Sequence, residues 1–500
     1  MKSFLAVEAT RRAYYEDATR NSVHRSSLTV PEIAGAEAEI SFLNHFLLKR
    51  GYDNVACRVS AVDESGARIG SRLLPIVEPR VYGFALGGLF QGRAASYLVE
   101  FFAAHNLFIP FPAVMVNHRG RKFLNSVHAY NRVLNDVFED DSINASHQRE
   151  ASIDVRVDSG TDTVVLLAAG AGALEGACEL ELATAAGRRR SEVAVTLPRF
   201  GHRWLSLRDT LPGAGPLASG VLKVKAPRQP MFYGRLLAGQ RSADGAWSAN
   251  HSYYDSSGTA EYWGDDSESE RLYPFFPGLE NRVRMYPIMS PSRLGLDVAF
   301  HGRDGRRLAR VPAGELTCPG DSLIDVDVGA LAGAAGLEPS ELAAFAVITR
   351  PRDGKSPTRV NHQLVHGAGA LASSINMSLG NRNMFAPESK VGLIWGQIPV
   401  WGRARSWLGL SANRCGGPDC ALEATFYGPE GELARRAWRL PAGGALVFDA
   451  IAELQPELGE PPRDAPAYVW YLVRSARPDI SAVAVTRHDD SGHTSGEHNF

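Results

Sequence analysis

The feature of this 500-residue sequence that most constrains its fold is a pattern that occurs four times. A short segment alternates apolar and polar residues and then reaches a turn glycine, as Ala56–Val62 does before Gly66. Alternation with a period of two is typical of a β-strand with one buried face, and glycine favours tight turns. The same pattern precedes Gly187, Gly305 and Gly431. The sequence therefore predicts four related β units.

A histidine follows each turn glycine at a similar distance. His128 lies 62 residues after Gly66 and His251 lies 64 residues after Gly187. His362 and His488 each lie 57 residues after the third and fourth glycines, Gly305 and Gly431. Similar spacing in every copy indicates one unit of roughly 110 to 125 residues that was duplicated. We expect each copy to close on a strand that carries its histidine.

Several short strands per copy, separated by Gly and Pro turns, predict an all-β fold. We expect four tandem antiparallel β-sandwiches of the immunoglobulin or fibronectin type, packed compactly. Helices are expected to be few and short, and the best candidates are residues 96–104 and 339–345. The predicted division of the chain is an N-terminal arm (1–35) and four repeats (36–149, 150–277, 278–390 and 391–500), the last with a His-rich tail.

The composition limits the kinds of partner and the cellular location that we expect for this protein. The formal net charge of -2 supplies no strong field for nucleic acid or for an anionic membrane. No segment approaches 18 consecutive apolar residues, and the first 30 residues lack the apolar core of an export signal. The five cysteines are few and odd in number, which indicates no disulfide framework. We therefore expect a cytoplasmic protein that binds neither nucleic acid nor membrane.

The four histidines are the strongest chemical signal. If the sandwiches pack compactly, His128, His251, His362 and His488 converge and can bind a transition-metal ion, because imidazole suits iron, zinc and copper. Alternatively, each histidine makes hydrogen bonds only within its own sandwich. Residues two and four positions after His251 share its strand face, so Tyr253 and Asp255 are the candidate catalytic residues.

The C-terminal tail adds further ligand-type side chains. Six of the eleven residues from 488 to 498 are His, Asp or Glu: His488, Asp489, Asp490, His493, Glu497 and His498. This density has no evident packing purpose. If the tail is ordered, we expect it to cover the cluster formed by the closing strands.

Two functions agree with these observations. The first is a metal-dependent enzyme that acts on a small organic or carbohydrate-like substrate; hydrolase, lyase and non-haem iron oxygenase stay open. The alternative is a non-catalytic scaffold of tandem β-sandwiches or a carbohydrate-binding protein. Convergence of the closing strands favours the first, whereas an extended string of domains favours the second.

Overall fold

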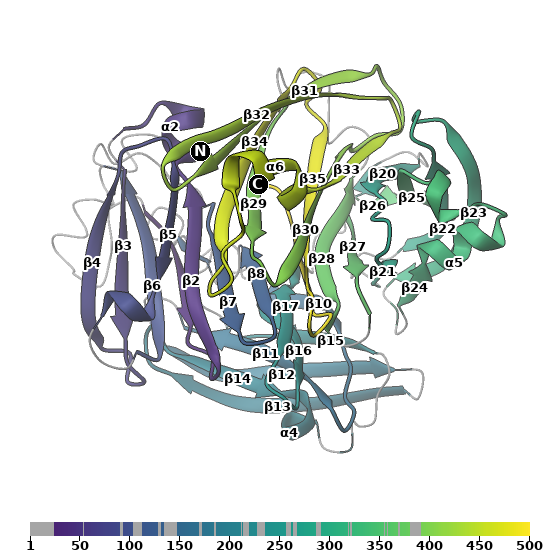
Figure 1. Ribbon diagram of the computed structural model, residues 1–500. Helices are drawn as coiled ribbons and strands as arrows, with labels where there is room; N and C mark the ends of the chain where they lie inside the picture. Colours follow the sequence, from purple (N-terminus) through teal and green to yellow (C-terminus); the bar gives the residue numbers. More distant parts are fainter. Residues whose placement is uncertain are drawn as a thin grey trace, which may run out of the picture.

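The computed structural model (Figure 1) is an all-β protein with antiparallel sheets and a few short helices. It describes residues 25–53, 55–90, 94–103, 113–128, 132–134, 148–169, 173–184, 187–211, 213, 220–227, 236–256, 262–263, 268–286, 292–318, 320, 323–354, 356–357, 359–368, 371–380 and 392–500. The strands form four successive β-sandwiches, which confirms the predicted fold class.

The first sandwich pairs a sheet of order β4-β3-β6-β1-β9 with one of order β5-β2-β7-β8. Its strands are β1 (Arg25–Pro31), β2 (Ala36–Leu43), β3 (Val55–Val62), β4 (Arg68–Ile76), β5 (Val81–Ala85), β6 (Ser96–Ala103), β7 (Met115–Gly120), β8 (Leu124–His128) and β9 (Arg132–Leu134). Strand β1 thus belongs to this sandwich, although the sequence placed residues 25–31 in the N-terminal arm. Residues 1–24 of that arm lie outside the described residues.

The second sandwich repeats this arrangement, with sheets of order β13-β12-β15-β10-β18 and β14-β11-β16-β17. Its strands are β10 (Gln148–Asp154), β11 (Thr161–Ala168), β12 (Leu174–Thr184), β13 (Gly187–Leu197), β14 (His202–Ser206), β15 (Val221–Lys225), β16 (Leu237–Ser242), β17 (Trp247–His251) and β18 (Tyr253–Ser256).

The third sandwich has sheets of order β20-β25-β22-β23 and β24-β21-β27-β28. Its strands are β20 (Ser269–Pro274), β21 (Asn281–Met285), β22 (Ser292–His301), β23 (Arg307–Cys318), β24 (Ile324–Asp327), β25 (Ala344–Pro351), β27 (Arg359–His366) and β28 (Ser373–Gly380). Strand β20 lies before the predicted limit at residue 277. A separate two-stranded sheet joins β19 (Tyr262–Trp263) to β26 (Ser356–Pro357).

The fourth sandwich has sheets of order β29-β34-β31-β32 and β33-β30-β35-β36. Its strands are β29 (Gly392–Val400), β30 (Ala404–Ala412), β31 (Cys420–Gly428), β32 (Gly431–Leu440), β33 (Ala445–Asp449), β34 (Ala467–Ser475), β35 (Ile480–His488) and β36 (Thr494–His498). Every sandwich therefore sets its first, sixth, third and fourth main strands in one sheet. The fifth, second, seventh and eighth form the other.

Short helices follow the fifth strand of each sandwich. These are η1 (Gly87–Leu89), α4 (Leu207–Thr210), α5 (Val328–Ala334) and α6 (Ala450–Leu458). Ser206, Asp327 and Asp449 cap the last three, because each side chain accepts a hydrogen bond from a backbone N–H of the first turn. Helices α2 (His45–Arg50) and η2 (Pro339–Glu341) lie elsewhere. No helix among the described residues is long and apolar enough to cross a membrane.

The helix expected at residues 96–104 is instead strand β6. The prediction was wrong because this strand is covered on both faces, so its sequence lacks alternation and does not distinguish strand from helix. Val99 and Phe101 are in the apolar core, while Glu100 is also fully buried and accepts a hydrogen bond from Arg58. The second expected helix shrinks to η2, since strand β25 begins at Ala344.

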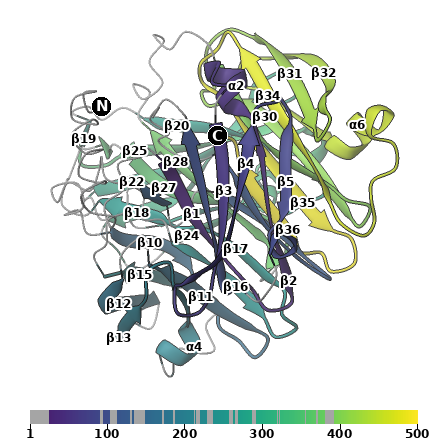
Figure 2. The same ribbon diagram turned by 90° about the vertical axis from the view of Figure 1, so that its left-hand side faces the viewer.

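The four sandwiches form a closed ring around a common centre (Figures 1 and 2). Their eighth strands, β8, β17, β28 and β36, contact one another in that cyclic order. Apolar cores cross the boundaries as well: Trp247 of the second sandwich and Trp470 of the fourth both join the core of the first. Compact packing, rather than an extended string, is thus the observed arrangement.

The turn glycines show that the ring has two kinds of contact between neighbours. A Cβ on Gly66 would lie 2.3 Å from the Arg199 carbonyl oxygen of the second sandwich, and a Cβ on Gly305 would lie 1.9 Å from that of Ala442 in the fourth. The equivalent Gly187 and Gly431 have open space around them. The first sandwich therefore docks on the second as the third docks on the fourth.

A candidate metal centre at the middle of the ring

Three sandwiches carry a histidine at the same place in their last hairpin. In each hairpin the end of the eighth strand pairs with the seventh: His128 with Met115, His251 with Leu237, and His498 with Val483. Each of these histidines is the fifth residue of its strand. Because the eighth strands meet at the centre of the ring, the repeat brings the three imidazoles together.

The third sandwich departs from this pattern. The fifth residue of its eighth strand, counted from Ser373, is Met377, which packs in the apolar core of that sandwich. The fourth donor comes instead from Glu497, which precedes His498 in β36. The set of His128, His251, Glu497 and His498, here named the central cluster, thus draws on the first, second and fourth sandwiches.

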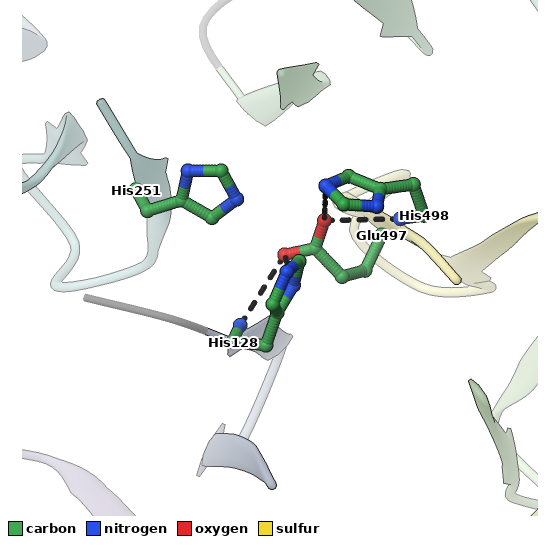
Figure 3. Close-up of side chains that lie close together, drawn as sticks. All are labelled: His128, His251, Glu497 and His498. Carbon is green, nitrogen blue, oxygen red and sulfur yellow. Dashed lines mark hydrogen bonds and ion pairs between the residues drawn. The ribbon is translucent and has the colours of Figure 1, made fainter. Parts of the chain in front are cut away.

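The geometry of the central cluster suits a metal ion. Its four candidate ligand atoms, one from each side chain, all lie within 4.8 Å of one another (Figure 3). Glu497 Oε2 is 2.9 Å from His128 Nδ1, and Glu497 Oε1 is 3.8 Å from His498 Nε2. The imidazole of His251 lies 4.9 Å from that of His128 and 5.9 Å from that of His498, centroid to centroid.

The central cluster is largely shielded from water. The residues His128, His251 and Glu497 are at most 4% exposed, whereas the side chain of His498 is 23% exposed. Burial of a carboxylate is costly unless hydrogen bonds or positive charge compensate it. Glu497 accepts backbone hydrogen bonds from His128 (3.3 Å) and His498 (3.0 Å), which hold its two oxygens in place.

Hydrogen bonds between neighbouring eighth strands fix the donors relative to one another. The Ser126 N–H donates to Ser495 Oγ across the fourth and first sandwiches, and the Ala249 N–H donates to Asn125 Oδ1 across the first and second, both at 2.9 Å. These two bonds join equivalent positions of their strands. The repeat therefore determines the spacing of the histidines.

Aromatic side chains cover one side of the central cluster. Phe500 lies 4.7 Å from His128, centroid to centroid, and stacks on Trp395 and Trp470. Its backbone N–H donates to the Trp395 carbonyl oxygen at 2.9 Å. The segment that follows β36 is thus packed against the cluster.

Two of the predicted ligands, His362 and His488, lie outside the central cluster. Both belong to seventh strands, β27 and β35. His362 forms a 2.6 Å hydrogen bond with the Tyr273 hydroxyl, and His488 lies against Trp401. Burial lowers the pKa of His362 to about 3 and also lowers that of His488. His362 therefore behaves as a neutral core histidine that bonds within its own sandwich, as in the alternative interpretation of the pattern, whereas His488 is buried against Trp401.

The structure thus brings together His128 and His251 and adds Glu497 and His498. The distance from the turn glycine does not identify the strand that carries the histidine. A histidine about 60 residues after that glycine lies on the eighth strand in the first and second sandwiches but on the seventh strand in the third and fourth. A better signal was available in the short segments Leu124–His128, Trp247–His251 and Thr494–His498, each of which follows a turn and ends in histidine.

The candidate catalytic residues Tyr253 and Asp255 lie in β18, whose backbone pairs with β10. Their side chains are outside the described part of the structure. Their assignment stays a prediction.

Fold and site together define a class: a ring of four tandem β-sandwiches with a buried histidine and glutamate cluster at its centre. No protein-family model and no curated protein matches the chain. Among solved structures, it is similar to a tetra-tandem repeat in the extending region of a large adhesion protein, with 10% identity over 95% of each chain and a TM-score of 0.10. At that TM-score the likeness carries no functional argument.

Proposed function

We propose that this protein is a tandem β-sandwich scaffold that binds one transition-metal ion through His128, His251, Glu497 and His498. The observation that carries the proposal is the convergence of four donor atoms from three sandwiches within 4.8 Å. Metal–ligand bonds of about 2.0 to 2.2 Å place such donors roughly 3.3 Å apart in a tetrahedron. Donor atoms that lie up to 4.8 Å apart would approach one another by as much as about 1.5 Å on binding a tetrahedral ion.

The donor set limits the metal. Imidazole and carboxylate ligands suit zinc, iron and copper, and the absence of cysteine from the set disfavours metals that prefer thiolate. Zinc is satisfied by four protein ligands, so a zinc ion here would be structural and would connect three sandwiches. Iron or copper accepts further ligands, and the partly exposed His498 marks the side from which one would enter.

We favour the scaffold over the enzyme, although convergence of the eighth strands was expected to favour the enzyme, because four protein donors would fill a tetrahedral site and leave no position for a substrate. The metal-dependent enzyme acting on a small organic or carbohydrate-like substrate stays a prediction. It would need a coordination position for water or substrate, in addition to the four protein donors. The cytoplasmic location also stays a prediction.

Metal analysis tests the proposal. The protein is stripped with a chelator, reloaded with Zn²⁺, Fe²⁺ or Cu²⁺, and analysed for bound metal per chain. We expect one ion in the native protein, and loss of that ion in His251→Ala and His498→Ala. The matched control is His488→Ala. His488 is a buried histidine in the same hairpin as His498, but it lies outside the central cluster. Absence of stoichiometric metal, or full retention by His251→Ala, would disprove the site.

A further inference from the structure

A chain of hydrogen bonds runs from the third sandwich to the central cluster. The Tyr286 hydroxyl donates to Gln363 Oε1, and Gln363 Nε2 donates to Asn376 Oδ1 at 2.8 Å. Asn376 Nδ2 lies 3.5 Å from His251 Nδ1. All four residues are at most 6% exposed. None of the described residues of the third sandwich belongs to the cluster, yet its eighth strand reaches His251 through this chain.

The chain contacts the side of His251 that faces away from the other donors. Figure 3 shows the outer ring nitrogen of His251, Nε2, pointing toward Glu497 and His498, and Nδ1 pointing away. The Ser252 carbonyl oxygen is a second neighbour of Nδ1, at 3.4 Å. The two Nδ1 neighbours make opposite demands, because an amide N–H needs an acceptor there and a carbonyl oxygen needs a donor.

We propose that Asn376, held by Gln363 and Tyr286, is a positioning residue that presents Nε2 of His251 to the metal. This inference rests on the proposed function of the central cluster. Metal-binding histidines commonly use their second nitrogen in a hydrogen bond that fixes the orientation and tautomer of the imidazole. Asn376 supplies this bond from the third sandwich, whose described residues include no candidate ligand.

Metal binding would reverse the donor and acceptor roles along this chain of hydrogen bonds. If Nδ1 accepts from Asn376 Nδ2 in the metal-free protein, as the proposal requires, the imidazole proton is on Nε2. Metal at Nε2 requires the lone pair of that nitrogen, so Nε2 loses its proton and Nδ1 gains one, with no net proton release. The two ends of a carboxamide have the same shape. Asn376 and Gln363 would then turn end for end, so that Asn376 Oδ1 accepts from Nδ1 and Gln363 Oε1 accepts from Asn376 Nδ2. The Tyr286 hydroxyl would turn its proton away and accept from Gln363 Nε2.

Substitution of Asn376 tests its role through metal affinity. Asn376→Leu keeps the size of the side chain and removes its hydrogen bonds, whereas Asn376→Asp provides an acceptor only. In a chelator competition with Zn²⁺ we expect Asn376→Leu to lower the affinity about 10- to 100-fold. Asn376→Asp should keep at least the wild-type affinity, since its carboxylate accepts from Nδ1 when metal is bound.

A matched control separates positioning from general loss of packing. Asn117 and Gln397 form a similar buried amide pair between the first and fourth sandwiches, with reciprocal hydrogen bonds of 3.1 and 2.8 Å. Gln397→Leu removes that pair without touching His251, and we expect its Zn²⁺ affinity to equal that of the wild type. An equal loss in Gln397→Leu and Asn376→Leu, or in Asn376→Asp and Asn376→Leu, would overturn the proposal.

The tautomer of His251 gives a readout that does not need metal. In ¹⁵N-histidine-labelled protein, with the His251 signal assigned by His251→Ala, we expect the Nε2–H form in the metal-free wild type. Zn²⁺ should shift the proton to Nδ1, and metal-free Asn376→Asp should already carry a proton on Nδ1. Persistence of the Nε2–H form in metal-free Asn376→Asp contradicts the positioning role. Failure of wild-type protein to bind Zn²⁺ contradicts the proposed function instead.

Discussion

Asn250 and Glu497 occupy the same position, the fourth residue of the eighth strand, in the second and fourth sandwiches. Each side chain accepts the N–H of the histidine that follows it, at 2.6 Å in Asn250 and 3.0 Å in Glu497. The Asn250 amide then donates to the Ser374 carbonyl oxygen, whereas the Glu497 carboxylate faces His128. One repeat position thus serves packing in one copy and belongs to the central cluster in another.

Replacement of Glu497 by glutamine should weaken metal binding while the fold persists. Glutamine keeps the size of the side chain and an acceptor oxygen for the N–H of His498 but loses the negative charge that stabilises a cation. We expect the Zn²⁺ affinity to fall by at least the roughly 10-fold typical of changes around a metal site. The control is Glu100→Gln, another buried glutamate, which pairs with Arg58 away from the cluster. Unchanged affinity in Glu497→Gln would remove the carboxylate from the ligand set.

Bound metal should stabilise the ring of sandwiches. A ligand present at 100 times its dissociation constant, and bound only by the folded protein, adds about 2.7 kcal/mol to the free energy of unfolding. We expect Zn²⁺ to raise the urea midpoint of the wild type and to leave that of His128→Ala unchanged. A similar rise in both proteins would show that Zn²⁺ acts elsewhere.

Stability should fall as the pH drops below about 6.5 because several histidines are buried in neutral form. Desolvation lowers the pKa of His362 to about 3, and that of His118 and His366 to about 4. Between these values and the ordinary pKa of 6.5 the unfolded chain binds more protons than the folded one, so acid favours unfolding.

His362→Gln isolates one such group, because the glutamine amide can replace Nε2 as a partner of Tyr273. The free energy of unfolding, measured in urea between pH 4 and 6, should then change by about 1.4 kcal/mol less per pH unit than in the wild type. An identical slope in both proteins would contradict the assigned pKa.

The contact at Gly66 should be sensitive to a single methyl group. Gly66 and Gly35 share a φ of 82°, so alanine is strained at either position, by about 1 to 2 kcal/mol. Only at Gly66 would the new Cβ also meet the Arg199 carbonyl oxygen, whereas Gly35 has nothing within 4 Å. Urea unfolding should show a greater loss of stability for Gly66→Ala than for Gly35→Ala; equal losses would mean that the contact contributes nothing.

The fold was accessible from sequence because each sandwich contains a strand with clear period-two alternation and a turn glycine, as at Ala56–Val62 and Gly66. Strand β6 could not be predicted from the sequence, since burial of both faces removes the alternation that identifies a half-buried strand. Assignment of β1 to the first sandwich also needed the structure, because pairing with β6 is a long-range contact.

Only two of the four residues of the central cluster could be predicted from the sequence. His128 and His251 stand out by their repeated position, but His498 shares that position under a different spacing. Glu497 had no distinguishing signal beyond the tail's composition, because its equivalents in other copies are Val127, Asn250 and Asn376. A candidate ligand that occurs in one copy alone cannot be found by comparing copies.

The closed ring has a consequence for how the central cluster would respond to strain. Its donors belong to three separate sandwiches, so a sliding movement of any one of these would change the distances among the donor atoms. Metal–ligand bonds tolerate changes of only about 0.2 Å. The affinity for the ion would therefore depend on the alignment of whole sandwiches. The spectrum of a bound Co²⁺ or Cu²⁺ ion would report changes in that alignment.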